Sequence, residues 1–298
     1  MAKTTLYTGC ATAIVTPMNA DLSVNYDVFG ALIEEQIAGG VSALVVSGTT
    51  GEASTLGDDE HVDGIRFAAQ KAAGRIPVIA GAGSNDTAYM IKLSQNAEKA
   101  GADALLLMTP YYNKASQRGL VASFTAVADV VNIPIMLYNI PGRTCVNIEI
   151  DTFVELAKHP RITAVKEAGG CINYMSRIID ACGDALDVYI GDDALTVPAM
   201  SLGAKGVVSV AGNIIPEVMS EMCDLCLKND FAAAGKLNIR YLKLFGDLLK
   251  LDVNPTPIKA AMNLMGKNAG GCRMPLYKME DAGLEALRKS LVAAGVMK

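Results

Sequence analysis

The sequence contains little of what metal sites and nucleic-acid sites need. Histidine occurs twice in 298 residues, tryptophan is absent, and 26 lysines and arginines are outnumbered by 31 aspartates and glutamates. A zinc site takes about four ligands, and His61 and His159 are the only imidazoles in the chain. The formal net charge is −5, with no basic stripe to offset it. We therefore expect no metal and no nucleic-acid partner.

Long apolar runs are also missing. No uninterrupted stretch approaches the ~20 residues that span a bilayer, and Met1–Thr5 holds no apolar signal region. Hydrophobic residues still make up 51% of the chain, against 19% charged residues, which is enough apolar material for one large core. We expect a soluble, cytoplasmic protein with no membrane partner.

The seven cysteines are odd in number and spread over a long chain. Free thiols are therefore expected rather than a disulfide framework. Cys223 and Cys226 form a lone C-x-x-C motif with no second pair nearby. Because two cysteines one helical turn apart commonly face the core, we favour that placement over metal or redox chemistry.

Short apolar runs alternate with longer segments of helical period. Several runs show no polar alternation, as expected for parallel strands buried on both faces. Between them lie segments such as Tyr26–Ala38, whose apolar residues fall on one helical face. The runs interpreted as strands are Cys10–Val15, Ala43–Ser47, Pro77–Ala80, Ala104–Met108, Pro134–Tyr138, Thr163–Lys166, Val188–Gly191 and Val207–Val210.

A local repeat supports strand–helix units. Gly40–Leu44, Gly101–Leu105 and Gly203–Val207 each begin with a glycine able to end a helix in the left-handed conformation, and each leads into an apolar strand. Eight such units predict an α/β fold, a (β/α)8 TIM barrel, over residues 1–215. Residues 216–298 are expected to supply the last barrel helix and a helical extension of the same structural unit. The helices expected there are Glu217–Lys228, Phe231–Leu251, one after Asn254–Pro257, and Asp281–Ala294.

Catalytic side chains of a barrel come from the C-terminal ends of its strands, and Lys166 ends one of them. Period two puts Lys166 on the face of Ile162 and Ala164, a face that could line the barrel interior. Burial disfavours an ammonium and makes the neutral, nucleophilic amine available. The alternative is a strand-end lysine that pairs with Glu167 or reaches solvent.

Three further groups follow strand ends, each with a plainer alternative. Tyr138 could shuttle protons beside an amine, or be an ordinary half-buried tyrosine. Arg143 offers a planar fork for a carboxylate, or forms a surface ion pair. In Gly48–Glu52, the hydroxyls of Thr49 and Thr50 and the backbone N–H groups suit a carboxylate cradle, or a capping turn.

Two other patterns carry less information. Tyr111 and Tyr112 close the fourth strand, where packing alone could explain them. Gly81–Asp86 resembles a phosphate loop, but Asp86 stands where the third glycine is needed, and its charge repels phosphate. We therefore expect no nucleotide site.

Taken together, Gly48–Glu52, Tyr111–Tyr112, Tyr138–Thr144 and Val165–Ala168 resemble the signatures of the dihydrodipicolinate synthase family of class I Schiff-base aldolases. The similarity covers essentially the whole chain, in order and at the family's spacings. It implies a lyase in which Lys166 condenses with pyruvate and the enamine attacks L-aspartate 4-semialdehyde. Cyclisation then gives 4-hydroxy-tetrahydrodipicolinate, on the route to lysine and diaminopimelate. A Schiff base is its own electron sink, so no cofactor is expected.

The resemblance also implies roles for single residues. Tyr138, Thr49 and Tyr112 match the family's proton-relay triad. Thr50 matches the residue that holds the carboxylate of pyruvate, and Arg143 matches the one that holds the carboxylate of the semialdehyde. A relay made of hydroxyls would also explain why no catalytic histidine is needed.

Further positions are implied in the same way. Gly191, Asp192 and Val208 fall where the family lines its pocket. In the family, the tyrosine that matches Tyr112 comes from the neighbouring subunit. This implies an obligatory homodimer, usually within a tetramer that is a dimer of dimers.

Two other functions stay open at this point. N-acetylneuraminate lyases resemble the chain too, but they typically carry Ser-Thr-Gly-Glu where Thr49–Glu52 stands, and they lack an arginine at the position of Arg143. A barrel that has lost catalysis and serves as a binding or regulatory protein is the other alternative, since fold does not fix function. Every expected catalytic position is filled here, which favours the enzyme.

In lysine-inhibited members of the family, lysine binds at the tight dimer interface beside the residue that matches Tyr111. Asn85 and His61 are also in place. However, Tyr89 stands where the pattern has a glutamate that pairs with the amine, and Asp58 stands where it has a histidine. Losing a buried charge partner weakens binding, so weak or absent feedback by lysine is expected.

Overall fold

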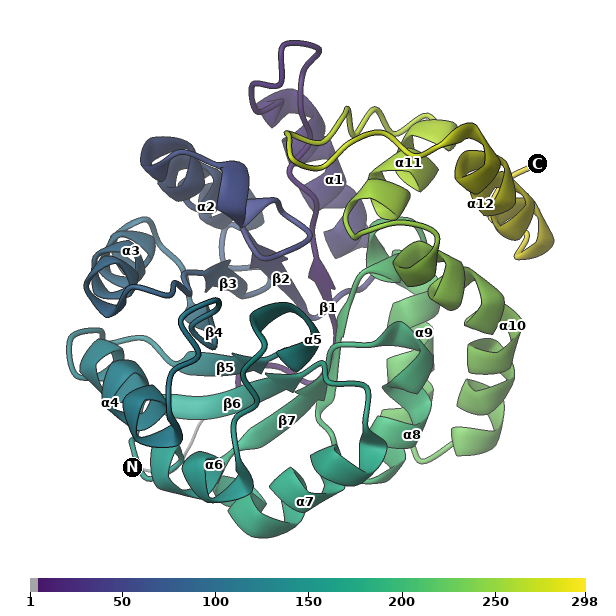
Figure 1. Ribbon diagram of the computed structural model, residues 1–298. Coiled ribbons are helices and arrows are strands. Elements are labelled where there is room, and N and C mark those ends of the chain that lie inside the picture. The colour runs from purple at the N-terminus through teal and green to yellow at the C-terminus, as the bar shows by residue number, and fades with distance from the viewer. Residues whose placement is uncertain (1–4) are drawn as a thin grey trace.

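The computed structural model describes residues 5–298, and its centre is a closed barrel of parallel strands (Figure 1). Each strand pairs with its neighbours in chain order, and the first pairs with the eighth to close the barrel. This confirms the predicted fold class. The strands are β1 (Gly9–Ala13), β2 (Ala43–Val46), β3 (Val78–Gly81), β4 (Ala104–Met108), β5 (Ile135–Asn139), β6 (Ile162–Glu167), β7 (Asp187–Ile190) and β8 (Gly206–Ser209).

Helices surround the barrel as an outer ring, and the last ones extend it on one side (Figure 1). The α-helices are α1 (Tyr26–Ala38), α2 (Asp58–Ala72), α3 (Thr87–Lys99), α4 (Gln117–Ala128), α5 (Pro141–Thr144), α6 (Ile150–Leu156), α7 (Ile172–Cys182), α8 (Thr196–Ser201), α9 (Pro216–Leu227), α10 (Phe231–Lys250), α11 (Thr256–Leu264) and α12 (Asp281–Ala293). Short 3-10 turns lie at Ala53–Thr55, Gly183–Ala185, Asp193–Leu195 and Ala211–Asn213.

The sequence pattern predicted most elements closely. Helix α1 has the predicted bounds, whereas the first strand ends at Ala13 and not at Val15. The three repeat glycines have positive φ angles, 76° at Gly40, 96° at Gly101 and 106° at Gly203. Each therefore ends its helix in the left-handed region that glycine reaches without strain.

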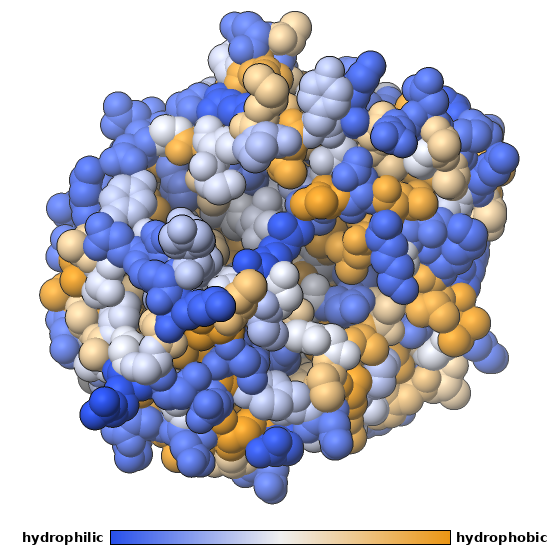
Figure 2. Space-filling model, viewed as in Figure 1, coloured by the Kyte–Doolittle hydropathy of each residue, from blue (hydrophilic) through white to orange (hydrophobic). Residues whose placement is uncertain are grey.

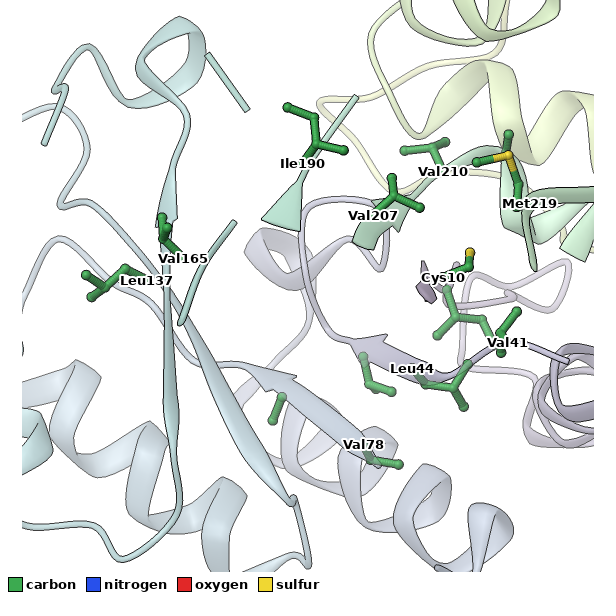
Figure 3. Packing of buried hydrophobic residues seen from close by; sticks show 14 of the residues in the cluster. Cys10, Val41, Leu44, Val78, Leu137, Val165, Ile190, Val207, Val210 and Met219 are labelled. Atoms are coloured by element: carbon green, nitrogen blue, oxygen red, sulfur yellow. The ribbon is translucent and has the colours of Figure 1, made fainter. Parts of the chain in front are cut away.

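Two separate layers of apolar side chains hold the barrel. The outer layer lies between strands and helices; the side chains labelled in Figure 3 belong to it. Cys223 and Cys226 are buried in this layer, which confirms the placement predicted for them. The inner layer fills the barrel. Its strand residues are Ala11, Ala13, Ala43, Val45, Ile79, Ala104, Leu106, Met136, Tyr138, Ala164, Tyr189 and Val208.

One detail of the prediction for the sixth strand is wrong. Ile162 was expected on the same face as Ala164, but Ile162 packs in the outer layer and Ala164 in the inner one. The pairing with β5 explains the change, because its register shifts after Ile162 and Thr163 is the extra residue of an irregularity. Period two still holds from Ala164 onward, so Lys166 keeps the inward direction.

The C-terminal helices form a compact group beside α8 and α9. Helix α10 packs against α8, α9, α11 and α12, and α11 also packs against α12. Within residues 5–298, no helix is both long enough and apolar enough to cross a membrane.

Candidate active site

Lys166 is the most distinctive polar side chain at the barrel mouth. It lies near the C-terminal end of β6, is only 6% exposed, and is paired across the sheet with Tyr138 of β5. Its Nζ lies 4.5 Å from the centre of the Tyr138 ring. Over residues 5–298 no carboxylate forms an ion pair with this ammonium. A buried amine held against a phenol ring, without a counter-ion, is suited to act as a nucleophile.

Glu167 was the expected partner if Lys166 were merely structural. Its carboxylate instead accepts hydrogen bonds from Asn139 Nδ2 at 2.7 Å and from the Gly169 N–H at 2.6 Å. Burial raises the pKa of Glu167 above its usual value, and these two hydrogen bonds oppose that shift. The alternative of a Lys166–Glu167 pair is therefore wrong.

Gly191 gives Lys166 room. A Cβ atom at Gly191 would lie 2.9 Å from Lys166 Cε and 2.7 Å from the Cβ of Ala168. Any larger residue here would push against the lysine side chain. Val208 packs in the inner layer, whereas the Asp192 carboxylate is used locally and accepts a hydrogen bond from the Ala194 N–H.

Asp193 was missed by the sequence reasoning. Its buried carboxylate accepts hydrogen bonds from the N–H groups of Val210 and Ala211, at 3.1 and 2.9 Å. Burial raises its pKa to about 6. These hydrogen bonds connect the loop after β7, which begins at Gly191, to the residues that follow β8.

The loops after β2 and β5 meet at a cavity of about 300 Å³. Thr49 and Arg143 both line it, together with Asn254 from the segment between α10 and α11. Thr50 is buried and accepts a hydrogen bond from Asn254, while Arg143 is exposed and donates to the Asn254 carbonyl oxygen. In Figure 2 this face of the molecule is hollowed near its centre, with both hydrophilic and hydrophobic side chains around the hollow. The structure thus brings Thr49, Thr50 and Arg143 together.

Another unpredicted feature is a buried ion pair behind this cavity. Lys259 Nζ of α11 lies 2.7 Å from Glu52 Oε1, and the two side chains are 2% and 0% exposed. Lys259 also donates to the Thr16 carbonyl, and Glu52 Oε2 accepts from the Arg273 N–H at 2.9 Å. Because Glu52 directly follows Thr49–Gly51, the pair anchors the threonine loop to the C-terminal segment.

Replacing Lys259 by methionine should lower the free energy of unfolding by about 3–5 kcal/mol, because Glu52 would remain buried without its cation. Chemical denaturation followed by circular dichroism would measure the loss. Lys158→Met is the matched control, since its ion pair with Glu155 is exposed and should change stability by less than about 1 kcal/mol. Equal effects of the two substitutions would contradict an anchoring role.

The two tyrosines after β4 behave differently. Tyr112 is 90% exposed and has a positive φ of 71°, so within one chain it does not join Lys166 and Tyr138. Tyr111 is 39% exposed and lines the 300 Å³ cavity. It also lines a second cavity of about 190 Å³.

The second cavity is lined by three of the five residues expected at a regulatory lysine site. His61 and Tyr89 line it with Tyr111. Burial lowers the pKa of His61, whose Nε2 lies 2.7 Å from the Gly81 carbonyl oxygen.

Tyr89 is hydrogen-bonded to Asp58, and both residues differ from those found in the lysine-inhibited members of the family. Its hydroxyl donates to Asp58 Oδ1 at 2.7 Å, and this hydrogen bond raises the pKa of Tyr89 to about 12. Lys92 forms an ion pair with the other oxygen of Asp58 at 2.9 Å. Asn85 is not among the residues that line the second cavity, and its carbonyl oxygen accepts a hydrogen bond from Asn113 Nδ2.

A buried lysine at a strand end of a closed (β/α)8 barrel, set against a tyrosine ring, defines the class of Schiff-base aldolases. The model of the dihydrodipicolinate synthetase family matches residues 6–294. The chain belongs to this family.

Individual members of the family match this chain over nearly their whole length. The chain is 46% identical to the 4-hydroxy-tetrahydrodipicolinate synthase of Thermoanaerobacter sp. (strain X514), over 98% of both chains. It is 47% identical to the synthase of Geobacter metallireducens, over 95% of this chain and 97% of the relative.

Solved structures give the same result. The chloride-inhibited dihydrodipicolinate synthase from Acinetobacter baumannii, in complex with pyruvate, superposes with a TM-score of 0.96 at 42% identity, covering 98% of this chain and all of that one. The enzyme from Cyanidioschyzon merolae with lysine bound gives a TM-score of 0.94 at 38% identity, covering 98% and 99% of the two chains.

Proposed function

We infer that this chain is a lyase that condenses pyruvate with L-aspartate 4-semialdehyde to give 4-hydroxy-tetrahydrodipicolinate, the first committed step of lysine and diaminopimelate biosynthesis. The observation that carries the inference is Lys166, buried against Tyr138 with no carboxylate counter-ion among residues 5–298. Membership of the family supports the choice of substrates.

The reaction begins with attack of the neutral Lys166 amine on C2 of pyruvate and loss of water, which forms an imine. Loss of a proton from C3 gives an enamine, and its C3 forms the new carbon–carbon bond with the aldehyde carbon. The amino group of the semialdehyde then attacks C2, closes the ring and releases Lys166. Every step requires proton transfer near the imine, and we propose the Tyr138 hydroxyl for it because the Tyr138 ring lies 4.5 Å from Lys166 Nζ.

The remaining roles follow the positions of the side chains. We propose that Thr49 and Tyr112 extend the proton relay from Tyr138, and that Thr50 holds the carboxylate of pyruvate. Arg143 is proposed to bind the carboxylate of the semialdehyde, because its planar fork is exposed at the cavity mouth. Gly191, with Asp192 and Val208, is proposed to complete the pocket.

A shared site is also part of the proposal. Tyr112 is 90% exposed, which leaves it available to a partner subunit, and the matching tyrosine of the family comes from the neighbouring subunit. We propose a homodimer in which Tyr112 enters the partner's site, arranged as a dimer of dimers in the cytoplasm.

A direct comparison of substrates tests the proposed function. Purified protein should produce the cyclic product from pyruvate and aspartate semialdehyde and show no measurable cleavage of N-acetylneuraminate. The physical reason is Arg143, which pairs with the second carboxylate that only the semialdehyde presents at that position. Cleavage of N-acetylneuraminate without activity on the semialdehyde would overturn the assignment and favour the sugar-acid aldolase.

Feedback by lysine is expected to be weak or absent. Tyr89 offers no charge for the lysine amine, and the nearby carboxylate of Asp58 is already bonded to Tyr89 and to Lys92. In an activity assay, millimolar lysine should leave most of the turnover intact. Half-inhibition at sub-millimolar lysine would contradict this expectation.

A further inference from the structure

Asn254 joins two residues that are proposed to bind different substrates. Its side-chain Nδ2 donates to Thr50 Oγ1 at 3.0 Å, and its backbone oxygen accepts from Arg143 Nη2 at 3.2 Å. The residue is 8% exposed and lines the same cavity as Thr49 and Arg143. It lies in the C-terminal segment, 204 positions from Thr50.

The direction of the bond to Thr50 determines what that hydroxyl can do. A hydroxyl carries one proton and two acceptor lone pairs. Because the amide of Asn254 donates, it occupies a lone pair and leaves the Thr50 proton for another acceptor. Among residues 5–298 no group accepts that proton. In a site for a keto-acid, the matching acceptor is a carboxylate oxygen.

Within the part of the chain that the structure describes, the side-chain amide of Asn254 forms a hydrogen bond through its nitrogen but not through its oxygen. Its Oδ1 atom is buried and has no hydrogen-bond partner within residues 5–298. The bond to Thr50 is therefore the side chain's one specific interaction in the described part of the chain. A residue that merely filled space would need no amide here.

We propose that Asn254 is a positioning residue for both substrates. Its side-chain amide aims the Thr50 hydroxyl proton at the carboxylate of the keto-acid, and its backbone carbonyl holds the Arg143 guanidinium at the cavity mouth. This rests on the proposed function, because it requires a keto-acid in the site. It also makes the segment between α10 and α11 part of substrate recognition.

Asn254→Ala separates the two contacts, because it removes the amide and keeps the backbone carbonyl. The pyruvate concentration that half-saturates borohydride trapping should rise about three- to tenfold, the effect of one lost hydrogen bond. The KM for aspartate semialdehyde should change by less than about twofold, since the contact to Arg143 persists. A parallel rise in both values would indicate general loosening of the loop and would overturn the proposal.

Asn263→Ala is the matched control. Asn263 lies in α11, the helix that follows Asn254, but its amide bonds the backbone of Gly270. Its substitution should leave both values unchanged. Asn254→Asp, which keeps the shape but cannot donate to Thr50, covers the case in which the alanine variant fails to fold. Its affinity for pyruvate should fall at least as far, and an unchanged affinity would overturn the proposal.

A double-mutant cycle shows whether Asn254 acts through Thr50. Thr50→Val alone should weaken pyruvate binding, and adding Asn254→Ala should then have little further effect. Fully additive effects would contradict the proposal. A wild-type chain that pyruvate and borohydride never modify would refute the proposed function itself. Trapping of the wild type with unchanged affinity in Asn254→Ala would refute only the role of Asn254.

Discussion

Lys166→Ala should yield a folded barrel whose turnover falls by at least about a thousandfold, the scale of losing a covalent nucleophile. The same protein should gain no covalent adduct when borohydride is added with pyruvate, whereas the wild type should gain one on Lys166. The reason is that borohydride reduces the imine to a stable secondary amine, which stays attached to the lysine that formed it. Mass spectrometry of peptides from the treated protein gives the site directly.

Lys166→Arg is the informative control for this experiment. Arginine retains the cation and much of the length, but its guanidinium stays protonated and cannot form the imine. Both variants should therefore be inactive, with circular dichroism spectra like the wild type. A pyruvate-dependent adduct on a different lysine, or an active Lys166→Arg protein, would show that Lys166 is not the nucleophile.

Tyr112→Phe should lower turnover by about 10²–10⁴-fold, the usual contribution of a proton-transfer group. Trapping of pyruvate by borohydride should largely persist, because Lys166 remains. When this variant exchanges subunits with Lys166→Ala, activity should return. Half of the dimers in an equal mixture are hybrids, and one of their two sites is intact, so about a quarter of the wild-type activity is expected from twofold symmetry.

The subunit exchange also has a clear negative outcome. Differential tagging and native mass spectrometry establish whether hybrids have formed. Hybrids without recovered activity would place Tyr112 in its own subunit's site, or outside the site altogether. Mixing Tyr138→Phe with Lys166→Ala is the control: Tyr138 and Lys166 lie side by side in one chain, so these hybrids should stay inactive.

Local patterns predicted the barrel well because its strands and helices are each defined by a short period of apolar residues. The repeat glycines Gly40, Gly101 and Gly203 marked helix ends for a local steric reason that the structure confirms. The prediction for Ile162 was wrong because the register irregularity depends on pairing with the neighbouring strand. The alternation of residues along one strand contains no information on that pairing. Lys166 was still placed correctly, since the irregularity precedes it.

The residues of the candidate site could be predicted only where they lie at or just after the ends of strands. Lys166 and Tyr138 lie near the ends of their strands and Thr49 follows one, and the barrel topology brings such ends together. The pairing of Glu52 with Lys259 spans 207 positions, and no periodicity links them. Asn254 was visible in the sequence only as part of a proline-rich helix start. Its contacts depend on how the C-terminal segment folds back over the mouth.

The buried pair between Glu52 and Lys259 has a consequence for how such a gene can be inherited. A recombination event that exchanged the last helices for those of another barrel would separate Glu52 from its cation and Thr50 from Asn254. The hybrid protein would then hold an unpaired carboxylate behind its binding site. The C-terminal part of the chain is thus as much a part of the cavity as the loops that carry Thr49 and Arg143.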